Sequence, residues 1–355
     1  MPDSAGAQQA PKGKPLIYIS SSPHIAAPVN TRILMNRVLL ALAPVSVFGI
    51  ILFGIPALLT ILVSAASAEI AEALFRKATG QDIRNSDLSA AVTGLLVALV
   101  LPPGMPLWMP ALGAVFGIIV GKEFFGGLGA NVFNPALVAR AFLVLSFPAA
   151  ATTWSAPRAL FGAAAADAVS GATPLGIIKL GGAVVDVGTS LASAGLAGGS
   201  DYWSTIGSLF FGTRAGCIGE SSIALILIGF VFLLASKTID WRAPLSMTAS
   251  FFVFSFLFGR DPLFAVLSGG LLFGAVFMAT DYVTAPITAS GKLIFGFGAG
   301  LITALIRQWG NYPEGVTYAI LIMNAVTPFL NKLIQKKYGY VKPQKAKKPE
   351  AGGGK

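Results

Sequence analysis

One threonine, in a long polar interruption of this hydrophobic chain, is placed to accept a covalently attached group. The hydroxyl of Thr173 ends a run of small and polar residues and is followed by Pro174, which cannot continue a helix interior. An enzyme that builds a phosphoester on a hydroxyl needs an open acceptor, and this run supplies one. The run consists of Asp167, Ala168, Val169, Ser170, Gly171, Ala172 and Thr173. On its letters alone, it is equally a simple Gly/Ser loop.

The chain's own side chains offer little redox or metal chemistry. Cys217 is the single cysteine, which excludes an internal disulfide, a cysteine-only iron–sulfur site and a zinc ribbon within this chain. His24 is the single histidine and has no ligand partners nearby, so a local cap or surface role is expected. We therefore predict no metal site, and electron transfer would depend on a bound cofactor.

A glycine-rich stretch from 121 to 136 is a second candidate region. Gly126 and Gly127 let the backbone turn sharply or approach a flat ligand closely. Asn131 and Asn134 precede Pro135, which suits the first turn of a helix. Two interpretations stay open: a capped helix entry, or a lining for a flavin or an ion.

A counterpart in the second half of the chain contains Asp281 and Thr284, shortly before Pro286. A carboxylate flanked by hydroxyls, and by carbonyls that proline leaves free, could coordinate a hard cation or relay a proton. The favoured interpretation is a solvated turn in which Asp281 pairs with Lys292.

Four further charged residues are expected at helix ends. Glu72 and Arg76 stand one helical turn apart and predict an ion pair. Lys122 and Glu123 end a hydrophobic span, where an ion pair or a side chain extended to the interface costs little free energy.

The composition predicts an all-α polytopic membrane protein. Hydrophobic residues make up 55% of the chain and charged residues only 11%, with a mean hydropathy of +0.75, whereas roughly a quarter of the residues in soluble domains are charged. Apolar runs of roughly 16–20 residues can cross about 30 Å of hydrocarbon. About ten transmembrane helices are expected, near residues 38–54, 57–76, 88–102, 106–122, 131–147, 221–238, 243–259, 262–279, 292–309 and 314–334.

Two stretches, 106–136 and 262–287, share an apolar helix followed by a Gly-containing polar segment and an X-Pro step. Paired interrupted segments of this kind suggest two duplicated halves, and similarity of composition alone is the alternative explanation.

Three regions follow: an N-terminal segment at 1–37, a transmembrane domain at 38–334 with a long loop at 148–220, and a basic disordered tail at 335–355. Lys and Arg flank several spans but are sparse in the long loop. The positive-inside rule therefore places both termini in the cytoplasm and the Thr173 loop in the periplasm. The net charge of +10 gathers largely in the tail, as a topology signal and not as a nucleic-acid site. All five tryptophans are expected to anchor the membrane interfaces.

The run from Asp167 to Thr173 matches the flavinylation motif of the Rnf and Na⁺-translocating NADH:quinone oxidoreductase families, in which a transferase esterifies an FMN phosphate to the threonine. The stretch Gly121–Ala136 and the segment Ser21–Pro44 strengthen the likeness. The chain resembles the RnfD/NqrB family over about residues 16–340, and its length suits the RnfD branch.

The resemblance implies a multi-pass subunit of an Rnf-type complex in the bacterial inner membrane, inactive alone. Covalent FMN on Thr173 would take part in electron transfer between ferredoxin and NAD, coupled to Na⁺ or H⁺ translocation. A second, non-covalent flavin (riboflavin) is also implied. The implied partners are a flavin transferase, the bilayer and other Rnf subunits, including a second FMN-bearing subunit and iron–sulfur subunits. A small-solute channel or transporter and a structural scaffold subunit stay open as alternatives.

Overall fold

The computed structural model describes residues 30–82, 85–154, 174–179, 201–212, 215–310, 312 and 314–334. All regular structure within these ranges is helical. The longer helices are α1 (Thr31–Phe53), α2 (Ile55–Ala78), α3 (Ser89–Leu99), α4 (Trp108–Gly121), α5 (Pro135–Ser146), α9 (Tyr202–Phe211), α10 (Ile223–Ala235), α11 (Arg242–Leu257), α14 (Ala289–Trp309) and α15 (Val316–Ile334).

These helices confirm the predicted all-α membrane architecture. In the described part, α1, α2, α14 and the segment Trp108–Phe125 are long and apolar enough to cross a bilayer, and α3, α5, α10 and α11 are shorter apolar helices. The first helix begins at Thr31 and not at residue 38, because the side chain of Asn30 accepts a hydrogen bond from the backbone N–H of Ile33 at 2.9 Å and caps the helix there.

The predicted continuous span at 262–279 is wrong, because the helix is broken inside the bundle. It consists of α12 (Pro262–Leu267), the short α13 (Leu271–Phe273) and one π-helical turn, η4 (Gly274–Met278). Gly269 at the break has φ +67°, a conformation that favours glycine. Arg307 donates to the freed carbonyls of Ala265 and Ser268 at 2.7 and 3.3 Å, which satisfies backbone groups that lipid could not.

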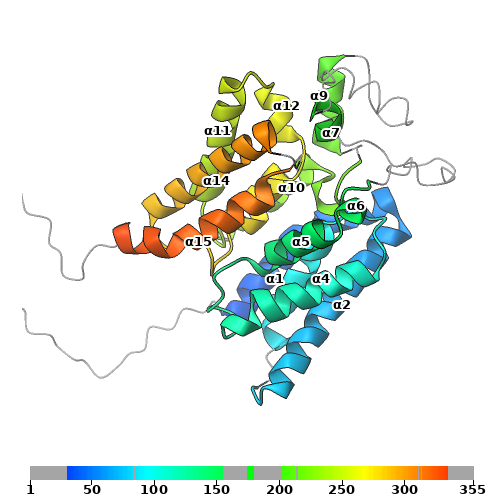
Figure 1. Cartoon of the computed structure of the whole chain (residues 1–355), viewed down its shortest axis with the longest axis vertical. Coiled ribbons are helices and arrows are strands. Elements are labelled where there is room, and N and C mark those ends of the chain that lie inside the picture. Colours follow the sequence, from blue (N-terminus) through cyan, green and yellow to red (C-terminus); the bar gives the residue numbers. More distant parts are fainter. Residues whose placement is uncertain are drawn as a thin grey trace, which may run out of the picture.

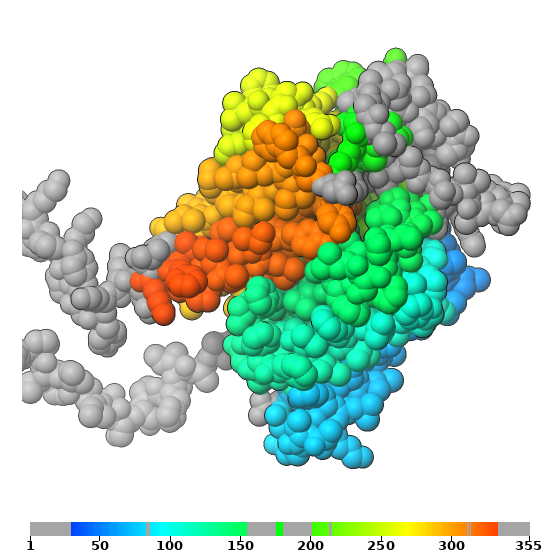
Figure 2. Space-filling view, in the orientation of Figure 1, coloured from blue at the N-terminus to red at the C-terminus, as the bar shows by residue number. Residues whose placement is uncertain are grey.

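The helices form two blocks, α1–α5 and α10–α15, which lie side by side (Figures 1 and 2). Within each block the second element packs on the fourth (α2 on α4, α11 on α14) and the fourth on the fifth (α4 on α5, α14 on α15). α1 and α10 run antiparallel across the boundary, since Arg37 Nη1 donates to the Ser236 carbonyl at 2.9 Å while Gly229 packs on the Ala41 carbonyl.

Equivalent helices of the two blocks therefore point in opposite directions, as in an inverted repeat. In this order the interrupted helix from Pro262 is equivalent to α3. The sequence pattern paired it instead with α4 and the stretch that leads into α5.

Glycines let the helices of each block approach closely. Gly113, Gly117 and Gly121 of α4 face α5, and Gly296 and Gly300 of α14 face α11. A Cβ at Gly117 would lie 2.6 Å from the Pro135 carbonyl oxygen. Small residues four apart are the usual means of close packing between membrane helices.

The predicted loop at 148–220 contains helices in its described residues: α6 (Pro148–Ala151), α7 (Pro174–Lys179), α9 and the 3₁₀ turn η3 (Ile218–Glu220). The segments 1–29 and 335–355 lie outside the described residues. Four tryptophans are exposed, as predicted for anchors (Trp108, Trp203, Trp241 and Trp309). Trp154 is the exception, because it is buried in a small cluster with Ala215 and Cys217.

Candidate functional site

The threonine motif itself (Asp167, Ser170, Gly171, Ala172 and Thr173) lies outside the described residues. Its covalent neighbour Pro174 begins α7, a short helix held firmly at one end of the bundle. Lys179 Nζ donates to the carbonyl of Gly310, at the end of α14, at 2.6 Å. Ile177 and Ile178 pack against a buried apolar cluster formed by α9, α10 and α12. The chain segment next to Thr173 is thus anchored on the second block.

Two of the predicted regions meet between the blocks. Asn134 caps α5, accepting hydrogen bonds from the backbone N–H groups of Ala136 and Leu137 at 3.0 and 3.4 Å, which confirms the capped helix entry. Its Nδ2 donates to the carbonyl of Met278, at the end of η4, at 3.4 Å. Asn134 and Asp281 then line one cavity of about 50 Å³.

Asp281 is held within its own turn and does not pair with Lys292. Thr284 Oγ1 donates to Asp281 Oδ2 at 2.9 Å. Lys292 instead binds Asp240 at 3.2 Å, beside Arg242, which binds the same carboxylate oxygen at 2.7 Å. Asp240, Asp281 and Lys292 line a second cavity of about 210 Å³. The predicted Asp281–Lys292 pair is therefore wrong, and Asp281 lies between two cavities.

Asp240 lies in the loop between α10 and α11, outside the membrane-spanning segments. Burial by itself raises the pKa of this carboxyl, but hydrogen bonds from the backbone N–H and side chain of Arg242 and from Lys292 outweigh burial. The net pKa lies below the ordinary 3.8.

The residues of the glycine-rich region do not come together at one site. Gly126 and Gly127 have φ of +110° and +89°, and a Cβ at Gly127 would come within 2.8 Å of Arg76 Nη2. Neither glycine lines the cavity shared by Asn134 and Asp281. Asn131 is buried with its Nδ2 donated to the Phe133 carbonyl at 3.1 Å, while its Oδ1 has no hydrogen-bond partner in the described part of the chain.

A buried ion network lies beside these glycines. The predicted Glu72–Arg76 pair is confirmed at 3.4 Å. Lys122 Nζ also binds Glu72, at 2.7 Å, and Arg76 binds Glu123 at 3.3 Å. Lys122 donates further to Ser89 Oγ and is only 1% exposed. Its side chain is therefore directed into the bundle and not towards the interface, because α2 presents a buried carboxylate to it.

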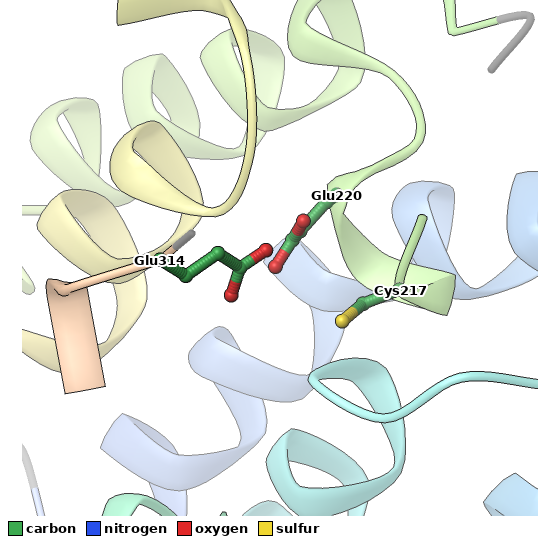
Figure 3. A group of neighbouring side chains, drawn as sticks. All are labelled: Cys217, Glu220 and Glu314. Atoms are coloured by element: carbon green, nitrogen blue, oxygen red, sulfur yellow. The ribbon is translucent and has the colours of Figure 1, made fainter. Parts of the chain in front are cut away.

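A second buried cluster was not predicted from sequence, and it joins three segments. Figure 3 shows three of its side chains, Cys217, Glu220 and Glu314. Arg140 of α5 lies 3.6 Å from Glu220 of η3 and also binds Glu314, which precedes α15. Cys217 Sγ is 3.7 Å from Arg140 Nη2. Ligand atoms of Cys217, Glu220 and Glu314 lie within 4.8 Å of one another. The guanidinium supplies the positive charge among these acids, so the arrangement is an ion-pair cluster.

The cluster also packs closely against the broken helix, since a Cβ at Gly270 would collide with the Glu220 carboxylate. No sequence signal marks these residues, because Arg140, Glu220 and Glu314 are isolated charges from segments far apart in the chain.

The two inverted helical blocks, the interrupted helix and the paired interior charges define a polytopic membrane protein with the architecture of an inverted repeat. The family model described as "NQR2, RnfD, RnfE family" matches residues 18–339. The chain belongs to this family.

Three relatives are similar along nearly their whole length. The chain is 43% identical to the D subunit of the proton-translocating ferredoxin:NAD(+) oxidoreductase complex of Clostridium ljungdahlii, over 91% of this chain and 96% of the relative. It is 38% identical to the Na(+)-translocating counterpart of Acetobacterium woodii, over 94% and 98%. It is 40% identical to the D subunit of the ion-translocating oxidoreductase complex of Stutzerimonas stutzeri, over 84% and 89%.

Proposed function

We propose that this chain is the D subunit of an Rnf-type complex, a membrane subunit that takes part in electron transfer between ferredoxin and NAD, coupled to ion translocation. The observation that carries the proposal is the family match over residues 18–339, which includes the Asp167–Thr173 motif. The relatives' names differ in the ion, H⁺ in one and Na⁺ in another, so the shared activity is the redox-driven translocation. The chain acts only as part of the complex.

FMN bound through a phosphoester to Thr173 would supply the redox chemistry, and this chain's residues would position it. Supporting this assignment, α7 begins directly after Thr173 and is tied to the end of α14 by the hydrogen bond from Lys179. A flavin attached next to a helix that is tied to the bundle would keep a limited distance from its electron-transfer partners.

The basic residues at the helix ends indicate the orientation of the chain in the membrane. Arg37, Arg76 and Arg242 lie near the ends of α1, α2 and α11 that are remote from α7. The positive-inside rule assigns that end to the cytoplasm and the α7 end, with the Thr173 segment, to the periplasm of a bacterial inner membrane.

We propose that the second, non-covalent flavin binds between the blocks, near the residues of the two candidate regions. Its candidate polar residues are the buried Oδ1 of Asn131, the side chain of Asn134 and the Asp281–Thr284 pair. The Oδ1 atom of Asn131, close in sequence to the N-terminus of α5, could accept a hydrogen bond from an N–H group of a flavin ring. The other implied partners, a second FMN-bearing subunit and iron–sulfur subunits, would supply the redox centres that this chain's single cysteine cannot.

The direct test is Thr173→Ala in a host that makes the flavin transferase. Wild-type chain should show ultraviolet fluorescence on a denaturing gel and the added mass of FMN in mass spectrometry, and Thr173→Ala should show neither. Thr153→Ala is the matched control: its hydroxyl binds the Ala149 carbonyl at 2.7 Å, and it should leave the flavin in place. An unmodified wild-type chain in this host contradicts the assignment.

A transporter-like role is the second candidate, and the interrupted helix α12–η4 is the observation that favours it. The two roles differ in the alanine variant. A transporter keeps its ion flux without the flavin, whereas a redox-driven subunit loses ferredoxin-dependent ion uptake in membrane vesicles.

A further inference from the structure

A cavity at the α7 end of the bundle gathers three cationic side chains from three separate elements. The cavity holds about 80 Å³ and is lined by Lys179 of α7, Arg260 between α11 and α12, and Arg307 in the last turn of α14. Asp261 is the one acid among the described residues of the lining, and these residues therefore carry more positive than negative charge.

Two of these cations are held by neutral groups. Lys179 binds the Gly310 carbonyl at 2.6 Å, and Arg260 Nε binds Gln308 Oε1 at 2.9 Å. Arg307 adds its charge from the side of the broken helix, where it donates to two backbone carbonyls. Asp261 caps α12, where its side chain accepts from the Phe264 N–H at 2.9 Å.

The nearest cations also act on one another. Burial and the neighbouring Arg260 lower the pKa of Lys179, as expected of two like charges held together. Glu314, the next acid along this side of the bundle, pairs with Arg140. An anion in the cavity would relieve the repulsion between Lys179 and Arg260.

The rest of the cavity is apolar and continues into a lipid-facing surface. Phe251, Phe258 and Phe264 form much of its wall. The Phe258 ring packs on Trp309 at 4.9 Å between centroids, and Trp309 is 69% exposed. Exposed tryptophans of this kind mark the level of lipid headgroups. Next to Phe258 along α11, Phe256 and Leu257 are also exposed.

The geometry points to a binding site for an anionic phospholipid. Its headgroup phosphate binds among Lys179, Arg260 and Arg307, and its acyl chains follow the exposed apolar face of α11. Phosphate oxygens accept several hydrogen bonds and carry the negative charge that the cavity lacks. Basic pockets between transmembrane helices are a recognised form of anionic-lipid site. This site does not depend on the redox function and would tie α7 to the bilayer.

The test uses the intact complex, delipidated in mild detergent and titrated with phosphatidylglycerol or phosphatidylcholine. Native mass spectrometry then measures the lipid retained on the released chain. We expect phosphatidylglycerol to be retained in preference to phosphatidylcholine. The double variant Lys179→Gln/Arg260→Gln should lower its affinity about thirtyfold, since each cation near the membrane surface contributes roughly fivefold and the two contributions multiply. Arg260→Lys, which keeps the charge, should retain most of the lipid.

The control Arg32→Gln removes an exposed cation at the other end of the bundle and should change nothing. Circular dichroism of each variant confirms that its helices are formed. Equal retention of the two lipids, or equal retention by wild type and the double variant, overturns the proposal.

A flavin phosphate on Thr173 carries the same chemistry, so Thr173→Ala forms a separate arm. Unchanged phosphatidylglycerol retention in this variant supports the lipid. Retention that arises only when the flavin is lost assigns the site to the flavin phosphate and overturns the lipid.

Discussion

Replacing Arg140 by methionine should destabilise the protein more than any replacement of an exposed arginine. Arg140 binds Glu220 and Glu314, and all three side chains are largely buried, at 10%, 3% and 17% exposure. Methionine keeps much of the volume but leaves two acids without their cation. Removing one partner of a buried ion pair typically costs about 3–5 kcal/mol, a shift of roughly a hundred- to several-thousandfold in the folding equilibrium.

Cys217 makes this measurable. It is the only cysteine and is fully buried, so a thiol-reactive dye reports the opening of the structure around it. Dye reaction in detergent micelles at increasing denaturant, together with loss of the helical circular dichroism signal, separates local opening of the cluster from global unfolding. Both signals should move to lower denaturant in Arg140→Met.

Two further variants sharpen the comparison. Arg242→Met removes the Asp240 pair, in which the arginine is 37% exposed, and should cost at most about 1 kcal/mol. Arg140→Met/Glu314→Gln also neutralises one of the two acids that Arg140 binds, and should recover part of the stability lost in Arg140→Met. Equal destabilisation by Arg140→Met and Arg242→Met would refute the claim that the buried cluster contributes more to stability than the exposed ion pair.

Two other perturbations have opposite or pH-dependent signs. Gly300→Ala places a Cβ against Ser250 and the Met247 carbonyl, and chemical unfolding should show a loss of about 1–3 kcal/mol in stability. Gly207→Ala is the matched control: its Cβ meets open space within a helix, so this variant should be more stable by up to about 1 kcal/mol. Equal effects of the two substitutions would contradict the close helix contact at Gly300. Because the pKa of Asp240 is lowered, its stabilisation is present above the ordinary 3.8 and is lost as pH falls through the lower folded value. Asp240→Asn should therefore lower the unfolding temperature at neutral pH, and the difference from wild type should shrink as pH falls below 3.8. A difference that stays constant as pH falls would argue against the ion pair.

Hydropathy placed the helices because bilayer thickness dictates the length of each apolar run, and this requirement is local in sequence. The same pattern could not show that the span from Pro262 is broken. Its residues are apolar on both sides of the short Ser268–Gly270 segment, and the break depends on Arg307, which binds the freed carbonyls from another helix. Trp154 failed as an interface anchor for a related reason, since its burial beside Cys217 is a contact between distant segments.

Charge pairing was predictable only where partners are neighbours in the sequence. Glu72 and Arg76, one helical turn apart, pair as expected. Of the two possibilities for Lys122, the ion pair is found and the extension to the interface is not, and its partner is Glu72 of α2. Lys292 pairs with Asp240 and not with Asp281. The partner of each lysine lies 50 or more residues away in the chain, and only the packing of the helices brings the two together.

The sequence by itself determined the membrane class, the family and the threonine proposed to carry FMN, because composition, span length and a contiguous motif are written in adjacent residues. Only the tertiary structure brought Asn134 and Asp281 to one cavity and Arg140, Glu220 and Glu314 to one cluster. It also gathered three cations at the end of the bundle. These sites form where residues far apart in the chain come into contact, and no local pattern records the pairing.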